Sequence, residues 1–361
     1  MAAVETGERR RTPLALLRAA RAARGGVQRL HRRMAPAPTA MLDMIGGHRT
    51  TQAIYVAARL GIADELAAGP LTPGEIARRV EADPDGVRRL LRALAGMEVF
   101  ALRPDGRYEL TPLADTLRSD HPRSTRSAAL YWGSPPHWEH WGHLVDAVRR
   151  GRPVVPALRG TDVWSYLRSE PEFAAAFDEA KEGLADSARE AVVEAYDFTE
   201  LHTVVDVGGG RGQLLTAILE VAPQARGVLF DQPSVVDGLG GLGERCAVEA
   251  GSYFDEVPEG ADCYLLKNVL HDWTEQQALQ ILGTIRRAVA PTGRLLLVET
   301  VIPEGNVPHP GKLADLEMLL LVGGRERTER DYRALLAQAG FELVRTLPTA
   351  SPLSILEAVP A

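Results

Sequence analysis

The stretch VVDVGGGRGQ, residues 204–213, places three consecutive glycines directly after a β-branched run that contains Asp206. One glycine marks a turn, whereas three indicate that a large group lies against bare backbone. The spacing is G-x-G-x-G, and the dinucleotide fingerprint would need a glycine where the chain has Gln213. A dinucleotide needs the helix start to cradle a pyrophosphate, whereas a nucleoside without phosphates needs only close backbone approach. The glycines in question are Gly208, Gly210 and Gly212.

Strand and helix patterns alternate from residue 196 to the C-terminus. Strands are predicted at 202–208, 225–231, 262–270 and 294–300, and helices at 213–223 and 274–290. Such alternation implies an α/β domain with a parallel sheet and helices on both faces. Ligands of such sheets bind at the carboxyl ends of the strands, and the three glycines follow one such end.

Asp231 strengthens this interpretation. It ends the second predicted strand, about 20 residues after the glycines, where a carboxylate can accept both hydroxyls of a ribose. The alternative is a turn or helix-capping residue before Pro233. The pairing with the glycine turn favours the ribose role.

Three titratable side chains are predicted to meet at the same edge. His271 and Glu299 each come just after or at the end of a strand, and Glu326 lies in a loop before a helix that Thr328 caps. A carboxylate that accepts a hydrogen bond from Nδ1 leaves Nε2 free to take a proton, for example from a phenol. The alternative is a core histidine with surface glutamates. No adjacent aspartates with an asparagine suggest magnesium, so we expect no metal. No G-x-S-x-G is present, so nothing indicates a Ser–His–Asp nucleophile.

Residues 39–120 have a different pattern, with three helices followed by two short strands around Asp105-Gly106. This is the plan of a winged helix. One interpretation is DNA binding through Arg88, Arg89 and Arg92, but acidic residues interrupt the basic face. A scaffold for dimerisation is the favoured interpretation.

Residues 121–195 read as a helical linker that contains four of the five tryptophans. The histidines at 137, 140 and 143 are spaced so that metal ligands would drift apart around a helix. The aromatic residues fill a core or line a pocket for a flat substrate, and the pattern leaves both open.

The net charge of −7 argues against nucleic acid and acidic lipid as partners of the whole chain. No apolar run is long enough for a membrane span, and two isolated cysteines fit a reducing cytoplasm. Residues 1–38 are arginine-rich, and we expect a disordered basic arm rather than a weak basic helix at a membrane or partner.

Five segments in order resemble the caffeate-type, S-adenosylmethionine-dependent O-methyltransferases, especially the bacterial members that methylate aromatic polyketides and similar secondary metabolites. The segments are DVGGGRGQLL, VLFDQP, LLKNVLHDW, LLLVETVIP and GGRERTERDYRALLAQAGF. The resemblance implies a winged-helix dimerisation domain that forms a homodimer, a linker that helps to cover the active site, and a Rossmann-like methyltransferase domain at 196–361.

The resemblance also implies roles for residues. His271 would be the base, flanked by Glu299 and Glu326, and the cofactor would be S-adenosylmethionine. The expected cofactor contacts are Asp206, Gly208, Gly210, Asp231, Ser252, Tyr253 and Lys267. The expected substrate contacts, from a small aromatic molecule, are Trp132, Asn268 and Asp272.

Two positions depart from the family pattern. Ser252 stands where an aspartate often touches adenine, and Lys181 stands where a methionine often clamps an aromatic substrate. Three other functions remain open: an S-adenosylmethionine-dependent hydroxylase or decarboxylase, an N-methyltransferase that needs no strong base, and, more remotely, a winged-helix DNA-binding regulator.

Overall fold

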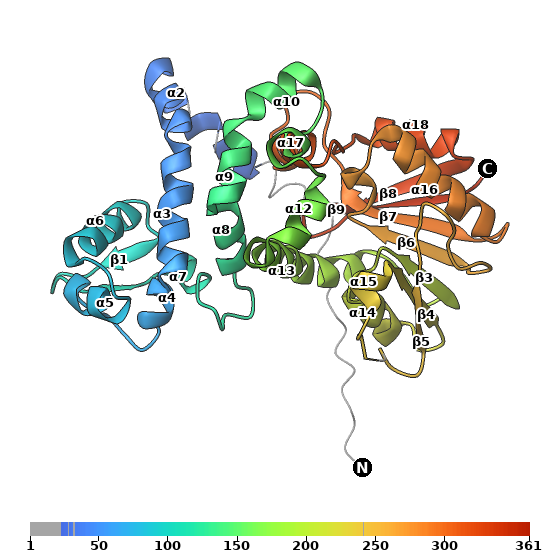
Figure 1. The fold of residues 1–361 in the computed structure, drawn as a ribbon, viewed down its shortest axis with the longest axis horizontal. Coiled ribbons are helices and arrows are strands. Elements are labelled where there is room, and N and C mark those ends of the chain that lie inside the picture. The colour runs from blue at the N-terminus through green and yellow to red at the C-terminus, as the bar shows by residue number, and fades with distance from the viewer. Residues whose placement is uncertain (1–22, 28, 32, 241) are drawn as a thin grey trace, which may run out of the picture. The chain divides into compact units, whose positions relative to one another are not determined.

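The computed structural model describes residues 23–361 except 28, 32 and 241, and for 182 and 184–187 it describes the backbone only. The described chain divides into two compact units (Figure 1). We call residues 150–153 with 188–361 the sheet unit, and residues 29–149 with 154–187 the helical unit. Each is described by itself. The segment 121–195, expected as a linker, is divided between them.

The sheet unit contains seven strands in the order β5-β4-β3-β6-β7-β9-β8. The first five of these are parallel, and β9 pairs antiparallel with both β7 and β8. From β3 the chain builds outward to β5 and then returns to place β6 on the other side of β3. The strands are β3 (Thr203–Val207), β4 (Arg226–Asp231), β5 (Cys246–Ala250), β6 (Cys263–Lys267), β7 (Arg294–Thr300), β8 (Phe341–Pro348) and β9 (Leu353–Pro360).

Helices cover both faces of this sheet (Figure 1). Val204 packs against α14 and the last turns of α13, whereas Val205 packs in the cluster with α16 and α18. Each fully buried side chain of this kind contributes ~1.5–3 kcal/mol. The expected Rossmann-like α/β fold is therefore confirmed. The helices are α13 (Pro171–Ala195), α14 (Gln213–Val221), α15 (Pro233–Val236), η1 (Leu270–Asp272), α16 (Glu275–Ala288), α17 (Gly311–Leu321) and α18 (Glu329–Gln338).

The helical unit begins with a helical domain and a two-stranded wing, as the sequence predicts. Thr72 and Glu75 form a capping box, and Gly106 turns the hairpin with φ +80°. The part of the chain before Gly69, which corresponds to the first of the three predicted helices, is three helices, broken at Gly46 and Gly61. The elements are α2 (Ala37–Ile45), α3 (Gly47–Arg59), α4 (Ile62–Glu65), α5 (Pro73–Arg79), α6 (Pro84–Ala95), β1 (Phe100–Leu102), β2 (Tyr108–Leu110) and α7 (Pro112–Asp115).

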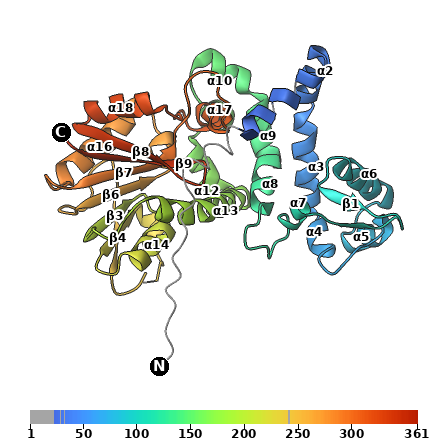
Figure 2. The same cartoon turned by 180° about the vertical axis from the view of Figure 1, so that it is seen from behind.

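The rest of the helical unit is helical (Figure 2). It is also rich in contacts between aromatic rings. Tyr131 stacks on Phe173, with ring centroids 5.5 Å apart, and both are buried, so these rings fill a core. His140 is fully buried, and burial lowers its pKa to about 4. The helices are α8 (Arg126–Gly133), α9 (Pro135–Gly142), α10 (Leu144–Arg150), α11 (Val155–Arg159), α12 (Val163–Ser169) and the first part of α13.

The N-terminal arm differs from expectation in its last part. Residues 23–27, 29–31 and 33–34 are helical, and α2 begins at Ala37, so these described residues differ from the disordered arm that the sequence suggests. Arg24, Arg29, Leu30 and Met34 are good helix formers, which accounts for the helical residues in spite of Gly25 and Gly26. The remainder of the predicted arm, 1–22, lies outside the described residues. Among the described helices, none is long and apolar enough to cross a membrane.

Candidate active site

Two neighbouring strand ends meet where the strand order reverses. Gly208 follows β3 and Val269 follows β6, and a Cβ added at Gly208 would lie 2.9 Å from Val269 Cγ2. Gly208 also has φ +70°, which disfavours any side chain there. The backbone of the glycine turn therefore lies bare at the switch point of the sheet, the place where such folds bind ligands.

His271 lies beside this point, on the short 3₁₀ turn η1, and three carboxylates surround its ring. Nδ1 is 3.4 Å from Glu326 Oε1 and 3.6 Å from Glu299 Oε2. Nε2 is 3.3 Å from Asp272 Oδ1. The structure thus brings together the three predicted catalytic side chains. Asp272, expected as a substrate contact, lies at the Nε2 edge of the ring.

The two glutamates are held in different ways. Oε1 of Glu299 accepts hydrogen bonds from the backbone amides of Val269 (3.0 Å) and Leu270 (2.9 Å), so this carboxylate also fixes the start of η1. The backbone amide of Glu326 donates to Asp315 Oδ1 over 2.9 Å, which ties its loop to α17. Both glutamates are buried, and Glu299 is completely so.

This arrangement changes the proton affinity of the ring. Burial by itself would lower the pKa of His271, but the carboxylates of Asp272, Glu299 and Glu326 outweigh burial and raise the pKa to about 9. Burial raises the pKa of Glu299 to about 7, against the attraction of His271. At neutral pH the histidine is therefore the main holder of a proton in the cluster.

The same cluster is the set among the described residues that could hold a metal ion. One ligand atom each from His271, Glu299 and Glu326 lie within 4.8 Å of one another. The sequence indicated no metal, and nothing in it suggested that these three side chains could act as metal ligands. Oε1 of Glu299 already accepts two backbone hydrogen bonds, which leaves Oε2 as its available donor atom.

The glycine turn and Asp231 form one bonded unit. Gly210 and Gly212 have φ of +61° and +73°, and the amide of Gly210 donates to Asp231 Oδ2 over 2.8 Å. Oδ1 of Asp231 accepts from the amide of Gln232. Both oxygens therefore already accept a backbone hydrogen bond, and through Oδ2 Asp231 shapes the glycine turn in addition to any contact with a ribose.

Asp206 lies beneath this cradle. It is completely buried, and within the described residues its Oδ1 has no hydrogen-bond partner. Burial raises the pKa of Asp206 to about 7, although the positive charge of Lys267 acts against this shift. A buried oxygen without a partner beside bare glycine backbone indicates a place for a bound cationic group.

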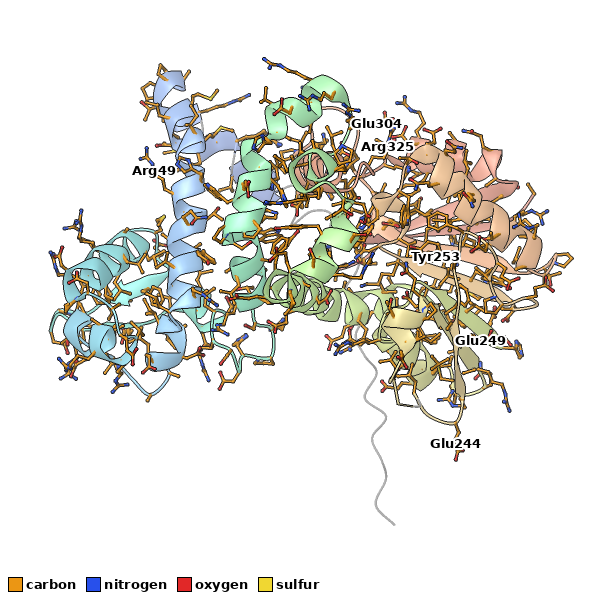
Figure 3. All side chains as sticks on the ribbon, viewed as in Figure 1. Arg49, Glu244, Glu249, Tyr253, Glu304 and Arg325 are labelled. Carbon is orange, nitrogen blue, oxygen red and sulfur yellow. The ribbon has the colours of Figure 1, made fainter. Side chains whose placement is uncertain are left out.

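The remaining predicted cofactor residues of the sheet unit lie at the same edge. Tyr253, which is labelled in Figure 3, is one of them. Its Cε1 would be 3.6 Å from a Cβ at Gly208, and its ring centroid lies 6.2 Å from that of Trp273. The hydroxyl of Ser252 accepts a hydrogen bond from the amide of Phe254, which stabilises the turn. Asn268 adopts φ +53°, an uncommon conformation outside glycine that re-aims the chain after β6.

Two residues named in the sequence analysis belong to the helical unit: Trp132, expected as a substrate contact, and Lys181, which departs from the family pattern. Trp132 is 42% exposed on α8. The Lys181 ammonium lies 5.1 Å from the Phe177 ring centroid and 5.8 Å from that of Trp164. Neither is placed relative to His271.

Sequence reasoning missed several residues that shape the site. Gly324 and Arg327 support His271 from the segment between α17 and α18, and Asp315 supports Glu326 from α17. The paired glycines of GGRER were a signal for close backbone approach, but the sequence did not say to what.

Both halves of the chain match known domain families. Residues 42–120 match the O-methyltransferase dimerisation domain, and residues 141–342 match the O-methyltransferase domain. The first match favours the scaffold interpretation of the winged helix over the DNA-binding one. The second spans more than half of the chain and contains the whole cluster around His271.

Individual relatives agree with these matches. The chain is 43% identical to the phenazine O-methyltransferase PhzM of Lysobacter antibioticus, over 90% of this chain and 97% of that protein. It is 36% identical to the 8-amino-8-demethylriboflavin N,N-dimethyltransferase of Streptomyces davaonensis, over 84% and 90% of the two chains.

Solved structures share the fold. The crystal structure of LaPhzM has a TM-score of 0.84 and 43% identity, covering 91% of this chain and 100% of that one. The O-methyltransferase NcsB1 from neocarzinostatin biosynthesis, in complex with S-adenosylmethionine and 2-hydroxy-5-methyl naphthoic acid, has a TM-score of 0.74 and 34% identity, covering 86% and 96%. The chain therefore belongs to the O-methyltransferase family that joins a dimerisation domain to a Rossmann-like catalytic domain, and it is an S-adenosylmethionine-dependent O-methyltransferase of small secondary metabolites.

Proposed function

We propose that the enzyme methylates a phenolic hydroxyl of a small aromatic metabolite, with His271 as the general base. The observation that carries this proposal is the imidazole surrounded by Asp272, Glu299 and Glu326 at the edge where the glycine turn lies bare. A relative bound to a hydroxylated naphthoic acid supports an aromatic substrate.

The residues at the strand ends fit S-adenosylmethionine. The bare turn at Gly208 admits a nucleoside amino acid, Asp206 offers a buried oxygen to its ammonium, and Asp231 lies one strand over for its ribose. We further propose contacts from Gly210, Ser252, Tyr253 and Lys267. When bound, S-adenosylmethionine supplies the methyl group as an electrophilic substituent of a sulfonium.

The protein's own part is to move one proton. Glu326 and Glu299 hold the Nδ1 edge of the ring, so Nε2 is the atom that takes the proton from the phenol. A base with a pKa of about 9 lies within about one unit of a phenol near 10, so the transfer costs about 1.4 kcal/mol or less. Asn268 and Asp272 border this proton path, and we propose them as substrate contacts together with Trp132.

The direct test is product analysis. The enzyme is incubated with S-adenosylmethionine and a panel of phenolic and amino-aromatic compounds, and the products are measured by mass spectrometry. A gain of one methylene on a phenol supports the proposal, and an added oxygen or a lost carboxyl group supports the hydroxylase or decarboxylase. The His271→Gln variant is expected to bind S-adenosylmethionine normally in calorimetry and to lose about 10²–10⁴-fold in kcat.

N-methylation is the second candidate, because a relative of 36% identity is an N,N-dimethyltransferase. A neutral amine needs no strong base, so the two reactions respond differently to loss of the imidazole. If the His271→Gln variant methylates an amine as fast as the unmodified enzyme does, the amine is the substrate and the base role is wrong.

We propose that the reaction needs no metal, although His271, Glu299 and Glu326 could bind one. Two of the hydrogen-bonding positions of Glu299 are already used by Val269 and Leu270. Methyl transfer is expected to proceed at an unchanged rate after dialysis against EDTA. A rate that falls with EDTA and returns with one divalent ion would overturn this.

We also propose a homodimer formed through the helical domain at 39–120. Helix α2 has no buried residue, and four of its apolar side chains are more than half exposed: Met41, Leu42, Met44 and Ile45. A Leu42→Glu/Ile45→Glu variant is expected to elute as a monomer in light-scattering chromatography. A dimer of unchanged stability would place the interface elsewhere.

A further inference from the structure

The segment between α17 and α18 contacts the backbone of η1, the turn that carries His271. The amide of Arg325 donates to the His271 carbonyl over 2.9 Å. A Cβ built at Gly324 would lie 1.9 Å from that same carbonyl oxygen, so no side chain fits there. The two chain segments therefore touch through bare backbone at the histidine itself.

Arg327 extends this contact along η1. Its side chain is buried, Nη1 donates to the Leu270 carbonyl over 2.9 Å, and Nη2 donates to the Trp273 carbonyl over 3.4 Å. These carbonyls stand on either side of His271. One guanidinium thus bridges the beginning and the end of the turn that presents the ring.

Arg327 is itself anchored to the sheet. Its carbonyl accepts a hydrogen bond from the Ile302 amide over 3.0 Å, next to the bridge between Val301 and Arg327 that continues β7. Its guanidinium lies 5.9 Å from the centroid of the buried Tyr332 ring. Since β7 also carries Glu299, the same strand supports η1 through Glu299 on one side and through Arg327 on the other.

The guanidinium forms no ion pair with a carboxylate anywhere in the described part of the chain. A buried cation without such a partner carries a desolvation penalty that hydrogen bonds to carbonyls offset only in part. If position 327 only had to pack against η1, an apolar side chain could do so without this desolvation penalty. A planar donor that reaches two carbonyls at once does what an apolar chain cannot, because it fixes the length and orientation of the turn.

We propose that Arg327 is a positioning residue, which holds η1 in the orientation that keeps the His271 ring between Asp272, Glu299 and Glu326. This proposal rests on the proposed role of His271 as the base. Arg327 does not touch the substrate, and it acts only through the backbone of the turn. Gly324 is the second part of the same support, because only glycine lets Arg325 reach the His271 carbonyl.

The test compares Arg327→Met and Arg327→Lys with a matched control, Arg286→Met. Arg286 lies in the same unit, donates to the carbonyls of Gly340 and Ala361, and lies 6.0 Å from the Phe341 ring centroid. It therefore shares the chemistry of Arg327 but does not contact η1. For each variant, kcat, KM, the pH profile of kcat/KM and the calorimetric Kd of S-adenosylmethionine are measured.

Arg327→Met is expected to lower kcat about 10²-fold, the effect of a misplaced catalytic group, with little change in KM. The Kd for S-adenosylmethionine is expected to stay within about twofold, because the glycine turn is untouched. The ascending limb of the pH profile is expected to move to lower pH, since a ring displaced from its three carboxylates titrates closer to its ordinary pKa. Arg327→Lys retains one donor and is expected to give a smaller change in the same directions.

Arg286→Met is expected to lower the melting temperature without moving the limb. If Arg327→Met does not yield folded protein, the proposal is tested with Arg327→Lys. In that variant the pH profile is measured together with an NMR titration of the His271 ring. A limb at the unmodified position in folded Arg327 variants, or an equal shift in Arg286→Met, overturns the proposal. Loss of methyl transfer by the unmodified enzyme on every phenol tested would instead contradict the proposed function.

Discussion

Strand β7 carries a cluster of charged side chains at each of its ends, and the two clusters are built in opposite ways. At the first residue, Arg294 lies 3.2 Å from Glu357 of β9, which also pairs with Arg345 and accepts a hydrogen bond from the Tyr196 hydroxyl. At the other end, Glu299 faces His271 and a second glutamate, with no arginine paired to either carboxylate among the described residues.

The polar atoms of the two clusters differ accordingly. Glu357 uses both oxygens in ion pairs and hydrogen bonds. At the other end, three buried atoms lack full hydrogen-bond geometry among the described residues: His271 Nδ1, Glu299 Oε2 and Glu326 Oε2. A satisfied cluster stabilises a fold, whereas an unsatisfied one is characteristic of a site that exchanges a proton. We therefore call the Arg294 end of β7 the structural end and the Glu299 end the chemical end.

Among the substitutions that test this difference between the two ends, Gly324→Ala at the chemical end is expected to have the largest effect on kcat. The new methyl group collides with the His271 carbonyl, so η1 must move and kcat is expected to fall about 10²-fold or more. Steady-state kinetics and calorimetry with S-adenosylmethionine measure the two consequences. The control is Gly283→Ala in α16, where only the tip of Arg287 is near, and this change is expected to leave kcat unaltered. An active Gly324→Ala enzyme would show that η1 tolerates displacement.

The next effect concerns pH. The proposed mechanism needs the neutral imidazole as its base, and the pKa of His271 is raised from its ordinary value near 6.5 to about 9. The kcat/KM of the unmodified enzyme is therefore expected to increase with pH up to about 9 and to level off above it.

Removing one carboxylate reverses part of that shift. Glu326→Gln is expected to move the ascending limb to lower pH and to reduce the plateau rate about tenfold, because one group that orients Nδ1 is lost. Glu329→Gln, an exposed partner of Arg333 on the adjacent helix, serves as the control and is expected to leave the limb in place. If the ascending limb of the pH profile does not move in Glu326→Gln, the limb reports the ionisation of a group other than His271.

A smaller effect is expected in cofactor binding. Burial raises the pKa of Asp206 to about 7, and a cationic ligand favours its ionised form, so binding is expected to release a proton below that pH. Affinity for S-adenosylmethionine is expected to rise about tenfold from pH 6 to pH 8, as a shift of about one pKa unit would give. Calorimetry in buffers of different ionisation enthalpy counts the protons, and Asp206→Asn is expected to flatten the dependence.

The smallest effect on catalysis is expected at the structural end. Glu357→Gln leaves Arg294 and Arg345 without their carboxylate, which is expected to lower the free energy of unfolding by about 1–3 kcal/mol. Thermal and urea denaturation measure this loss. The rate and its pH profile are expected to be unchanged, and a change in either would show that the two ends of β7 are coupled.

Much of the fold was predictable from the sequence, because local rules decide it. The β-branched runs, the glycine turn, and the caps Thr72, Thr274 and Thr328 are each set by residues close in the chain. The meeting of His271 and Glu299 was also predictable, since strands of one parallel sheet bring their carboxyl ends to one edge. Glu326 was predicted to join them from the loop before the helix that Thr328 caps.

What escaped prediction depends on contacts between distant segments. The approach of Asp272 to Nε2, the second task of Glu299 as a backbone acceptor, and the bridge from Arg327 to η1 all require coordinates. The described helical residues between 23 and 34 escaped for another reason, because an arginine-rich composition suggests a solvated tail, although arginine is itself a good helix former.

The two backbone hydrogen bonds to Glu299 allow the ionisation of this carboxyl to be followed by NMR. The amides of Val269 and Leu270 donate to one oxygen of a carboxyl whose pKa lies near 7, so their proton chemical shifts record whether it is charged. Two backbone resonances can thus follow the ionisation of the resting enzyme with no substrate present and no dye attached.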